Sequence, residues 1–336
     1  MTSWETMRPP MKIILTDNRH GIWTSKVSLM AMFDYMLETK QYGQIDITEI
    51  ESKSEEDIKR LCMDKFQTIP SDMVIFLQKF INLSTLNIPP SIKLNIIIDD
   101  IHQKNEDRKC KILEFRKCSR IFAMAYYVFD NFYNRSEINY PRLFPFAHFP
   151  NYLATFNPNP IAKILVSGRL NKDIYPFRHL MLEKSRTNKA ISYLPVNFAY
   201  RIPKDNVSYI YGARYIDHLS KYLVCFTCDS CPQRPYIVKK FFEIPASGSL
   251  LLAANTSTKV FFEEMGFIDG IHYISASLCD IDSKIAYVLD PKNRPEIDQI
   301  RGRGQELVAS RHMHTHRADY LDSVLNSGLK IEKITL

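Results

Sequence analysis

Short apolar runs rich in β-branched residues alternate along the chain with longer amphipathic stretches. In the first half, runs at residues 11–17, 45–50, 72–80, 92–100 and 120–129 predict buried strands. Amphipathic patterns at residues 25–40 and 54–66 predict helices, and Ser54, three residues before Asp57, is a typical N-cap. Strands separated by helices favour a parallel sheet with helices on both faces.

The alternation stops at residues 141–160, which contain five prolines and show no regular period. Because proline removes a backbone donor and biases the preceding residue away from helix, this segment predicts a linker. Beyond it, strands are expected at residues 162–168, 222–228, 249–255 and 271–275, and helices after 175–178, over 236–246, near 258–266 and from 281 to 325. The pattern therefore predicts two α/β halves of similar size.

Composition narrows the class of protein. A chain of 336 residues favours two domains, and a net charge of +7 favours an anionic partner. Acidic residues interrupt nearly every basic run, which argues against nucleic acid and favours a local site for a small anion. The apolar runs are too short to cross a bilayer and the start of the sequence does not resemble a signal peptide, so we expect a cytoplasmic protein with reduced cysteines and no transmembrane segment.

Ligands of open parallel sheets lie beyond the carboxyl ends of the strands. In the first half these positions hold carboxylates and imidazoles that suit a general base. The candidate catalytic residues are Asp17, His20, Asp100 and His102. The alternative for this group is structural, with Asp100 capping the next helix and His102 packing.

In the second half the same rule points to Gly168 and Arg169, since arginine binds phosphate oxygens through a permanently charged fork. Lys239 and Lys240 stand four and three residues before Glu243, so all three can approach one helix face, in a helix for which Pro235 suits the first turn. Two lysines at a helix start can hold a diphosphate, and a carboxylate can accept hydrogen bonds from a ribose diol. The alternative for Arg169 is an ordinary loop arginine. The alternative for the lysines and Glu243 is a solvated Lys–Glu pair, which the spacing alone favours over a diphosphate site.

Three cysteines stand close together in the chain, with two residues between each and the next: Cys225, Cys228 and Cys231. A zinc or iron–sulfur site usually needs a fourth ligand, and none stands nearby. His312 and His316 likewise lack a matching third ligand. We therefore expect buried thiols and no metal site.

Taken in order, four stretches of the second half resemble the glycosyltransferase-like domain of the CgeB-type spore-maturation family, within the two-domain GT-B superfamily. They are "KILVSGRLNKDIYPFR", "YIDHLSKYLVCFTCDS", "VKKFFEIPASGSLLLAANT" and "VLDPKNRPEIDQIRGRGQELVASRHMHTHRADYL". The resemblance covers residues 163–324 and implies a GT-B-like α/β fold, two Rossmann-type domains with parallel sheets facing an interdomain cleft. The implied domains are an acceptor-side domain at 1–152, a donor-binding domain at 153–316 and a C-terminal helix at 317–336.

The resemblance implies a metal-independent glycosyltransferase that uses a nucleoside-diphosphate sugar, without a cofactor, on a glycan, protein or small-molecule acceptor. By position, Glu243 would hold the ribose, and basic residues the diphosphate. The implied donor-binding residues are Gly168, Arg169, Arg178, Cys228, Lys239, Lys240, Glu243, Ser247, Gly248 and Ser249. Pro235 stands where many retaining members carry a second glutamate, which leaves the stereochemistry open. The alternatives are a sugar-nucleotide epimerase or hydrolase of the same fold, or an inactive nucleotide-sugar-binding module.

Overall fold

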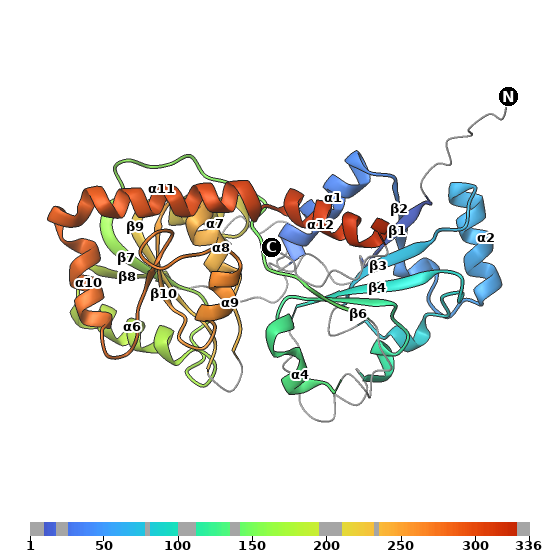
Figure 1. The fold of residues 1–336 in the computed structure, drawn as a ribbon, viewed down its shortest axis with the longest axis horizontal. Coiled ribbons are helices and arrows are strands. Elements are labelled where there is room, and N and C mark those ends of the chain that lie inside the picture. Colours follow the sequence, from blue (N-terminus) through green and yellow to red (C-terminus); the bar gives the residue numbers. More distant parts are fainter. Residues whose placement is uncertain are drawn as a thin grey trace. The chain divides into compact units, whose positions relative to one another are not determined.

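The computed structural model describes residues 10–17, 26–77, 81–99, 112–134, 142–194, 210–231 and 235–327 (Figure 1). The chain forms two compact units. Met1–His20 with Phe33–Ala147 makes the first unit, and Gly21–Met32 with His148–Leu336 makes the second. No helix within the described ranges is both long enough and apolar enough to cross a membrane.

The first unit is built on a parallel sheet of six strands in the order β2-β1-β3-β4-β5-β6. Its strands and helices are β1 (Lys12–Thr16), β2 (Tyr42–Asp46), α2 (Glu55–Phe66), β3 (Asp72–Leu77), β4 (Lys93–Ile98), β5 (Arg120–Ala123), α4 (Phe129–Phe132) and β6 (Arg142–Pro145). Helix α1 (Lys26–Thr39) is divided between the units after Met32. Helix α2 begins where predicted, because the Ser54 hydroxyl accepts the Asp57 amide at 3.2 Å.

Three strands of this sheet differ from the prediction. β5 ends at Ala123, where the sequence predicted a strand to residue 129, and residues 126–132 form a 3-10 turn and α4 instead. β2 ends at Asp46, where the sequence predicted a strand to residue 50. The Asp46 carboxylate accepts the Thr48 amide at 3.0 Å and starts a 3-10 turn, Ile47–Glu49, which ends the ladder. β6 lies inside the segment that was predicted to be a linker. It is an edge strand, where proline is tolerated because one side of the strand needs no ladder hydrogen bonds.

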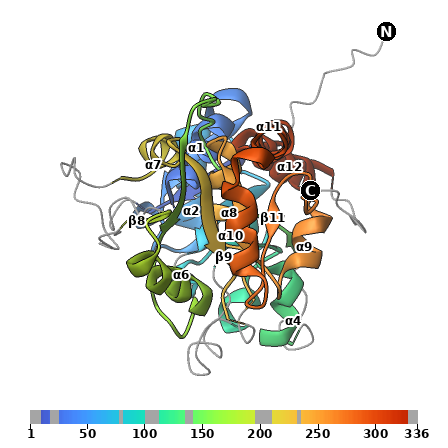
Figure 2. The same cartoon turned by 90° about the vertical axis from the view of Figure 1, so that its left-hand side faces the viewer.

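The second unit contains a parallel sheet of five strands in the order β11-β10-β9-β7-β8. Its strands and helices are β7 (Ile161–Ser167), α6 (Pro176–Thr187), β8 (Ile191–Leu194), α7 (Ala213–Leu219), β9 (Tyr222–Cys228), α8 (Lys240–Ala246), β10 (Leu250–Ala254), α9 (Lys259–Glu264), β11 (Ile274–Ser275), α10 (Ile281–Leu289), α11 (Arg294–Arg311) and α12 (His314–Ser327). In Figure 2 the edge strands β8 and β11 lie on opposite sides of β9.

Both sheets follow the same winding order. Numbered within its own unit, each runs 2-1-3-4-5, with one further strand added in the first unit. In this doubly wound order the chain reverses direction across the sheet between the first and third strands. The reversal falls between β1 and β3 in the first unit and between β7 and β9 in the second.

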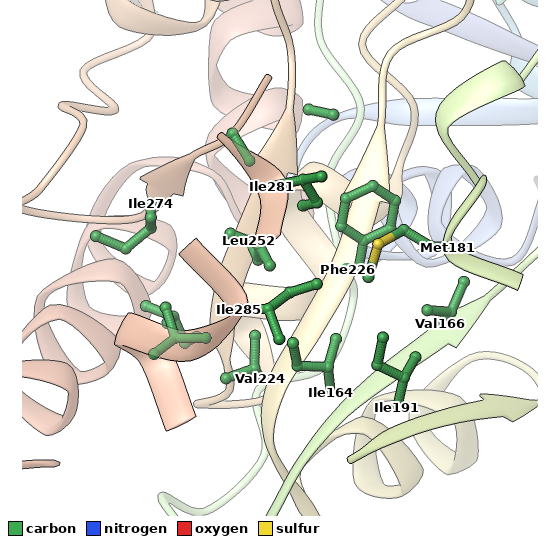
Figure 3. Close-up of a cluster of buried hydrophobic side chains, with 14 of the residues drawn as sticks. Ile164, Val166, Met181, Ile191, Val224, Phe226, Leu252, Ile274, Ile281 and Ile285 are labelled. Atoms are coloured by element: carbon green, nitrogen blue, oxygen red, sulfur yellow. The ribbon is translucent and has the colours of Figure 1, made fainter. Parts of the chain in front are cut away.

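The core of the second unit fills one face of its sheet. Side chains of β7, β9 and β10 alternate, so that residues such as Ile164, Val224 and Leu252 meet Met181 of α6 and Ile285 of α10 (Figure 3). Because parallel strands are covered on both faces, these strands read in the sequence as nearly continuous apolar runs.

Helix α11 packs closely on the rest of this unit through residues 301–304, "RGRG". The Arg301 guanidinium lies 4.6 Å from the Phe156 ring and donates to the carbonyls of Gly248 and Asn157, at 2.8 Å each. At Gly304, a Cβ atom would stand 2.5 Å from the His272 carbonyl oxygen. The stretch is therefore structural.

Replacing Gly304 with alanine is expected to destabilise the protein by about 1–3 kcal/mol, since the added methyl group meets backbone that cannot easily yield. Gly302 provides a control in the same helix, because nothing lies within 4 Å of its added Cβ. Gly302→Ala should be stabilising by up to about 1 kcal/mol through helix propensity. Urea unfolding followed by circular dichroism measures both, and equal effects would contradict the close approach.

Candidate anion-binding site

A group of charged side chains gathers at the carboxyl ends of β7 and β9, the switch point of the second sheet. Gly168 follows β7 directly and has a φ of +104°, which favours glycine. A Cβ atom there would stand 2.7 Å from Lys240 Nζ and 3.3 Å from Arg178 Nη1. The glycine thus lets two cations approach the end of the strand. We call Arg178, Lys239 and Lys240 the cation cluster.

Arg178 enters the cluster from the first turn of α6, which begins at Pro176, whereas the sequence predicted a helix only after residues 175–178. Its side chain is buried, its guanidinium lies 4.1 Å from the centre of the Tyr175 ring, and its Nη1 donates to the Arg169 carbonyl at 2.8 Å. Its Nε is buried without a hydrogen-bond partner in the part of the chain that the structure describes. The arginine is thus held rigidly with one donor still unused.

The two lysines lie at the start of α8. Lys239 Nζ is 3.1 Å from Glu243 Oε1, and both side chains are largely buried. Burial, followed by the nearby Arg178 guanidinium, lowers the pKa of Lys240 to about 8. Among the described residues, no carboxylate lies within ion-pair distance of Arg178 or Lys240. Three cations and one carboxylate leave excess positive charge, which an anion could neutralise.

The nearest acidic residue beyond β9 does not neutralise the cluster. The Asp229 carboxylate accepts the Ser257 amide at 3.0 Å and the Thr258 hydroxyl at 3.3 Å. Burial raises the pKa of Asp229 to about 7, which disfavours its charged form. Beside it, the Ser230 hydroxyl is buried and has no hydrogen-bond partner in the described ranges.

The cysteines of β9 are separated by the strand alternation. Cys228 belongs to the core on the α6 and α10 face, whereas Cys225 lies on the other face and its thiol donates to the Leu219 carbonyl. Burial raises the pKa of Cys225 to about 12 and raises that of Cys228, so both remain thiols. In the ranges that the structure describes, no three His, Cys, Asp or Glu side chains gather as a metal site would require.

The structure divides the predicted donor-binding residues into two places. Gly168, Arg178, Lys239, Lys240 and Glu243 lie together, with Cys228 at the adjoining end of β9. The Arg169 side chain is exposed, and it is the backbone carbonyl of this residue that contacts the cluster.

Ser247, Gly248 and Ser249 lie at the amino ends of the strands, opposite the cation cluster, in the turn before β10. The Ser249 hydroxyl donates to the carbonyls of Leu219 and Tyr222, at the amino end of β9, and the Ser247 hydroxyl donates to the Ile244 carbonyl. These three residues therefore lie away from the cation cluster, at the other end of α8. The physical reason is that α8 runs antiparallel to the strands, so its last residues are far from the carboxyl edge.

The start of α8 also differs from the prediction. The helix begins at Lys240, whereas the sequence predicted a first turn near Pro235. Ile237 and Val238 are buried in non-helical backbone, and Pro245 inside the helix has no amide to donate, so the helix is short. The positive charge of the site therefore comes from the side chains of the cation cluster and not from the dipole of a long helix.

The candidate general bases of the first unit are described only in part. Asp17 follows β1 at the carboxyl edge and is half-buried. His20, Asp100 and His102 lie outside the described residues. The choice of base among these four stays a prediction.

Sequence reasoning missed Tyr215 of α7, which contacts both β7 and the cluster. Its hydroxyl is 2.7 Å from the Ser167 hydroxyl and its ring centre is 5.7 Å from Lys240 Nζ. Nothing in "ARYIDHL" distinguishes this tyrosine from an ordinary core residue. Only the packing of α7 on the sheet reveals the contact.

The two parallel, doubly wound sheets of six and five strands define a GT-B fold, the architecture of many glycosyltransferases. Residues 178–323, less than half of the chain, match the model of a family described as glycosyl transferase-like. No curated protein matches the chain by sequence. The CgeB-type family itself stays a prediction.

Solved structures share this fold at low sequence identity. HepE from Anabaena, in complex with UDP-glucose, has a TM-score of 0.64 and 11% identity over 95% of this chain and 100% of its own. An alpha-glucosyltransferase (AGT) in complex with UDP has a TM-score of 0.61 and 11% identity over 94% of this chain and 99% of its own. Sucrose-phosphate synthase from Thermosynechococcus elongatus has a TM-score of 0.57 and 6% identity over 94% of this chain and 98% of its own.

Proposed function

We propose that this protein is a glycosyltransferase that takes a sugar from a nucleoside-diphosphate donor without a bound metal. The observation that carries the proposal is the cation cluster at the switch point of the second sheet, where Arg178 and Lys240 have no carboxylate partner in the described part of the chain. The glycosyl transferase-like match over residues 178–323 and the structural neighbours solved with UDP or UDP-glucose support the same reading.

In this proposal the cluster stabilises the leaving group. As the bond between the sugar C1 and the diphosphate oxygen breaks, negative charge grows on the diphosphate, and the Arg178 and Lys240 cations neutralise it. An oxygen of the acceptor forms the new bond to C1 and gives its proton to a base or to solvent. Lysine and arginine side chains thereby perform the role that a divalent ion has in other transferases.

Glu243 is the proposed ribose contact. Its carboxylate is largely buried, and one oxygen is paired with Lys239, so the carboxylate is held in place beside the cluster. A fixed carboxylate can accept hydrogen bonds from both hydroxyls of a ribose diol. In this proposal the nucleoside lies on the α8 side of the diphosphate.

The direct test is calorimetric titration of the protein with UDP and UDP-glucose, with and without EDTA. Binding that EDTA leaves unchanged is expected, followed by release of UDP when a suitable acceptor is present. If none of UDP, ADP, GDP or their glucose conjugates bound at millimolar concentration, the proposal would be wrong. UDP release together with free glucose, and no acceptor product, would indicate a hydrolase.

Glu243→Ala is expected to weaken UDP binding by about 1.5–3 kcal/mol, because hydrogen bonds to a charged carboxylate are lost. Inorganic pyrophosphate, which has no ribose, should bind the variant at least as well as the wild type. Glu263→Ala is the matched control, since Glu263 forms the same i,i+4 pair with Lys259 on α9, on an exposed surface. Equal losses for UDP and pyrophosphate would show that Glu243 acts on the cluster and not on the ribose.

A further inference from the structure

Tyr215 joins the end of β7 to the cation cluster. The side chain is buried, and its hydroxyl is 2.7 Å from that of Ser167, the last residue of β7. Its ring centre is 5.7 Å from Lys240 Nζ, within the range at which an aromatic face attracts an ammonium group. The next residue after Ser167 is Gly168, against which the same ammonium group packs.

The other groups that face Lys240 mostly oppose its charge. Arg178 of α6 and Lys239 of α8 are cations, and burial keeps the Cys228 thiol of β9 neutral. Glu243 favours the ammonium form, but its carboxylate is paired with Lys239. Burial, followed by the Glu243 charge, raises the pKa of Tyr215, so the phenol stays neutral and contributes through its ring.

We propose that Tyr215, anchored by Ser167, is a positioning residue that holds the Lys240 ammonium at the end of β7, and that diphosphate binding is coupled to protonation of Lys240 there. The second half of this inference rests on the proposed function, because it takes the cluster as the diphosphate site. The first half concerns Lys240 alone and is testable without any ligand.

The coupling has a definite direction. With a pKa of about 8 in the free protein, Lys240 loses its charge as the pH rises through that value. The diphosphate of UDP-glucose keeps its charge over this range, since it is esterified at both ends. Its affinity is therefore expected to fall about tenfold from pH 7 to pH 9, as the charged form becomes the minor one. In Lys240→Met the decrease over this interval should be much smaller, and what remains would report other groups such as Asp229.

Three variants separate positioning from general stability. Tyr215→Phe keeps the ring and should retain the wild-type pH midpoint to within a few tenths of a unit. Tyr215→Leu removes the ring and should lower the midpoint by about half a unit or more. Tyr273→Leu is the control, because Tyr273 is also buried in this unit but hydrogen-bonds Asn255 and lies outside the cluster. A merely structural role of Tyr215 would lower affinity equally at every pH.

The protonation of Lys240 is measured directly by competitive acetylation against pH, with mass spectrometry of the peptide that contains it. An acetylation midpoint near 8 that moves down in Tyr215→Leu but not in Tyr215→Phe or Tyr273→Leu supports the positioning role. An unchanged midpoint in Tyr215→Leu overturns it. If the midpoint moves as expected but UDP-glucose does not bind the wild type, the positioning role stands and the coupling to a diphosphate fails together with the proposed function.

Discussion

Lys240→Met is expected to stabilise the ligand-free protein and to weaken UDP-glucose binding at least tenfold at pH 7. Burial and Arg178 hold the pKa of Lys240 near 8, below its ordinary value of 10.5, so the charged form costs folding free energy on the order of 3 kcal/mol. Methionine keeps the apolar stem and removes this cost. The same change removes one cation that would neutralise the diphosphate.

The pH dependence follows from the sign of the shift. From about pH 8 to pH 10.5 the unfolded chain still holds the proton that the folded protein has lost, so stability of the wild type rises over this interval. In Lys240→Met this rise should be absent. Thermal unfolding from pH 7 to pH 10 measures the difference. Lys184→Met, which removes a lysine paired with the exposed Asp282, is the control and should change stability by less than about 1 kcal/mol. A destabilised Lys240→Met protein with unchanged UDP-glucose affinity would show that Lys240 is structural.

Asp72→Ala is expected to destabilise the first unit by about 3–5 kcal/mol, because it leaves a buried arginine without its counter-ion. Asp72 Oδ1 lies 2.8 Å from Arg120 Nη1, and both side chains are almost completely buried at the amino ends of β3 and β5. Asn95 of β4 donates to Asp72 at 3.0 Å and accepts from Arg120 at 3.0 Å, which completes a network across three strands.

The control for this pair is the exposed Lys59–Glu56 pair of α2, at 2.7 Å. Glu56→Ala should cost less than about 1 kcal/mol, since solvent screens the charges. Hydrogen exchange of β3–β5 measures the local effect without assuming that the two units unfold together. The double variant Asp72→Ala with Arg120→Met should recover part of the loss. Similar protection of these strands in wild type and Asp72→Ala would contradict the role of the buried pair.

Much of the fold follows from local pattern. Strands buried on both faces must be apolar along their whole length, and "YLVCFTC" forms β9 over the expected seven residues. Ser54 marks the start of α2 because its hydroxyl suits an unsatisfied first turn. The sequence misplaced β2, extended β5 too far and missed β6 and β8. A side-chain hydrogen bond ends β2, and β6 and β8 are edge strands with weaker apolar patterns.

The candidate site was predictable only in part. Lys239 and Glu243 stand four residues apart, and this spacing alone accounts for their contact. The serines after α8 follow the lysines and Glu243 closely in the chain, but the direction of the helix carries them to the amino ends of the strands.

Taken by itself, the sequence determined two α/β halves, their parallel strands and the residue types able to bind an anion, because burial and helix capping act over a few residues. Only the tertiary structure decided that Gly168, Arg178, Tyr215 and Lys240 meet at one point. These residues come from separate elements, and their meeting depends on β7 and β9 being neighbours in the sheet. Strand order is set by the packing of the whole unit, which no local pattern of polar and apolar residues encodes.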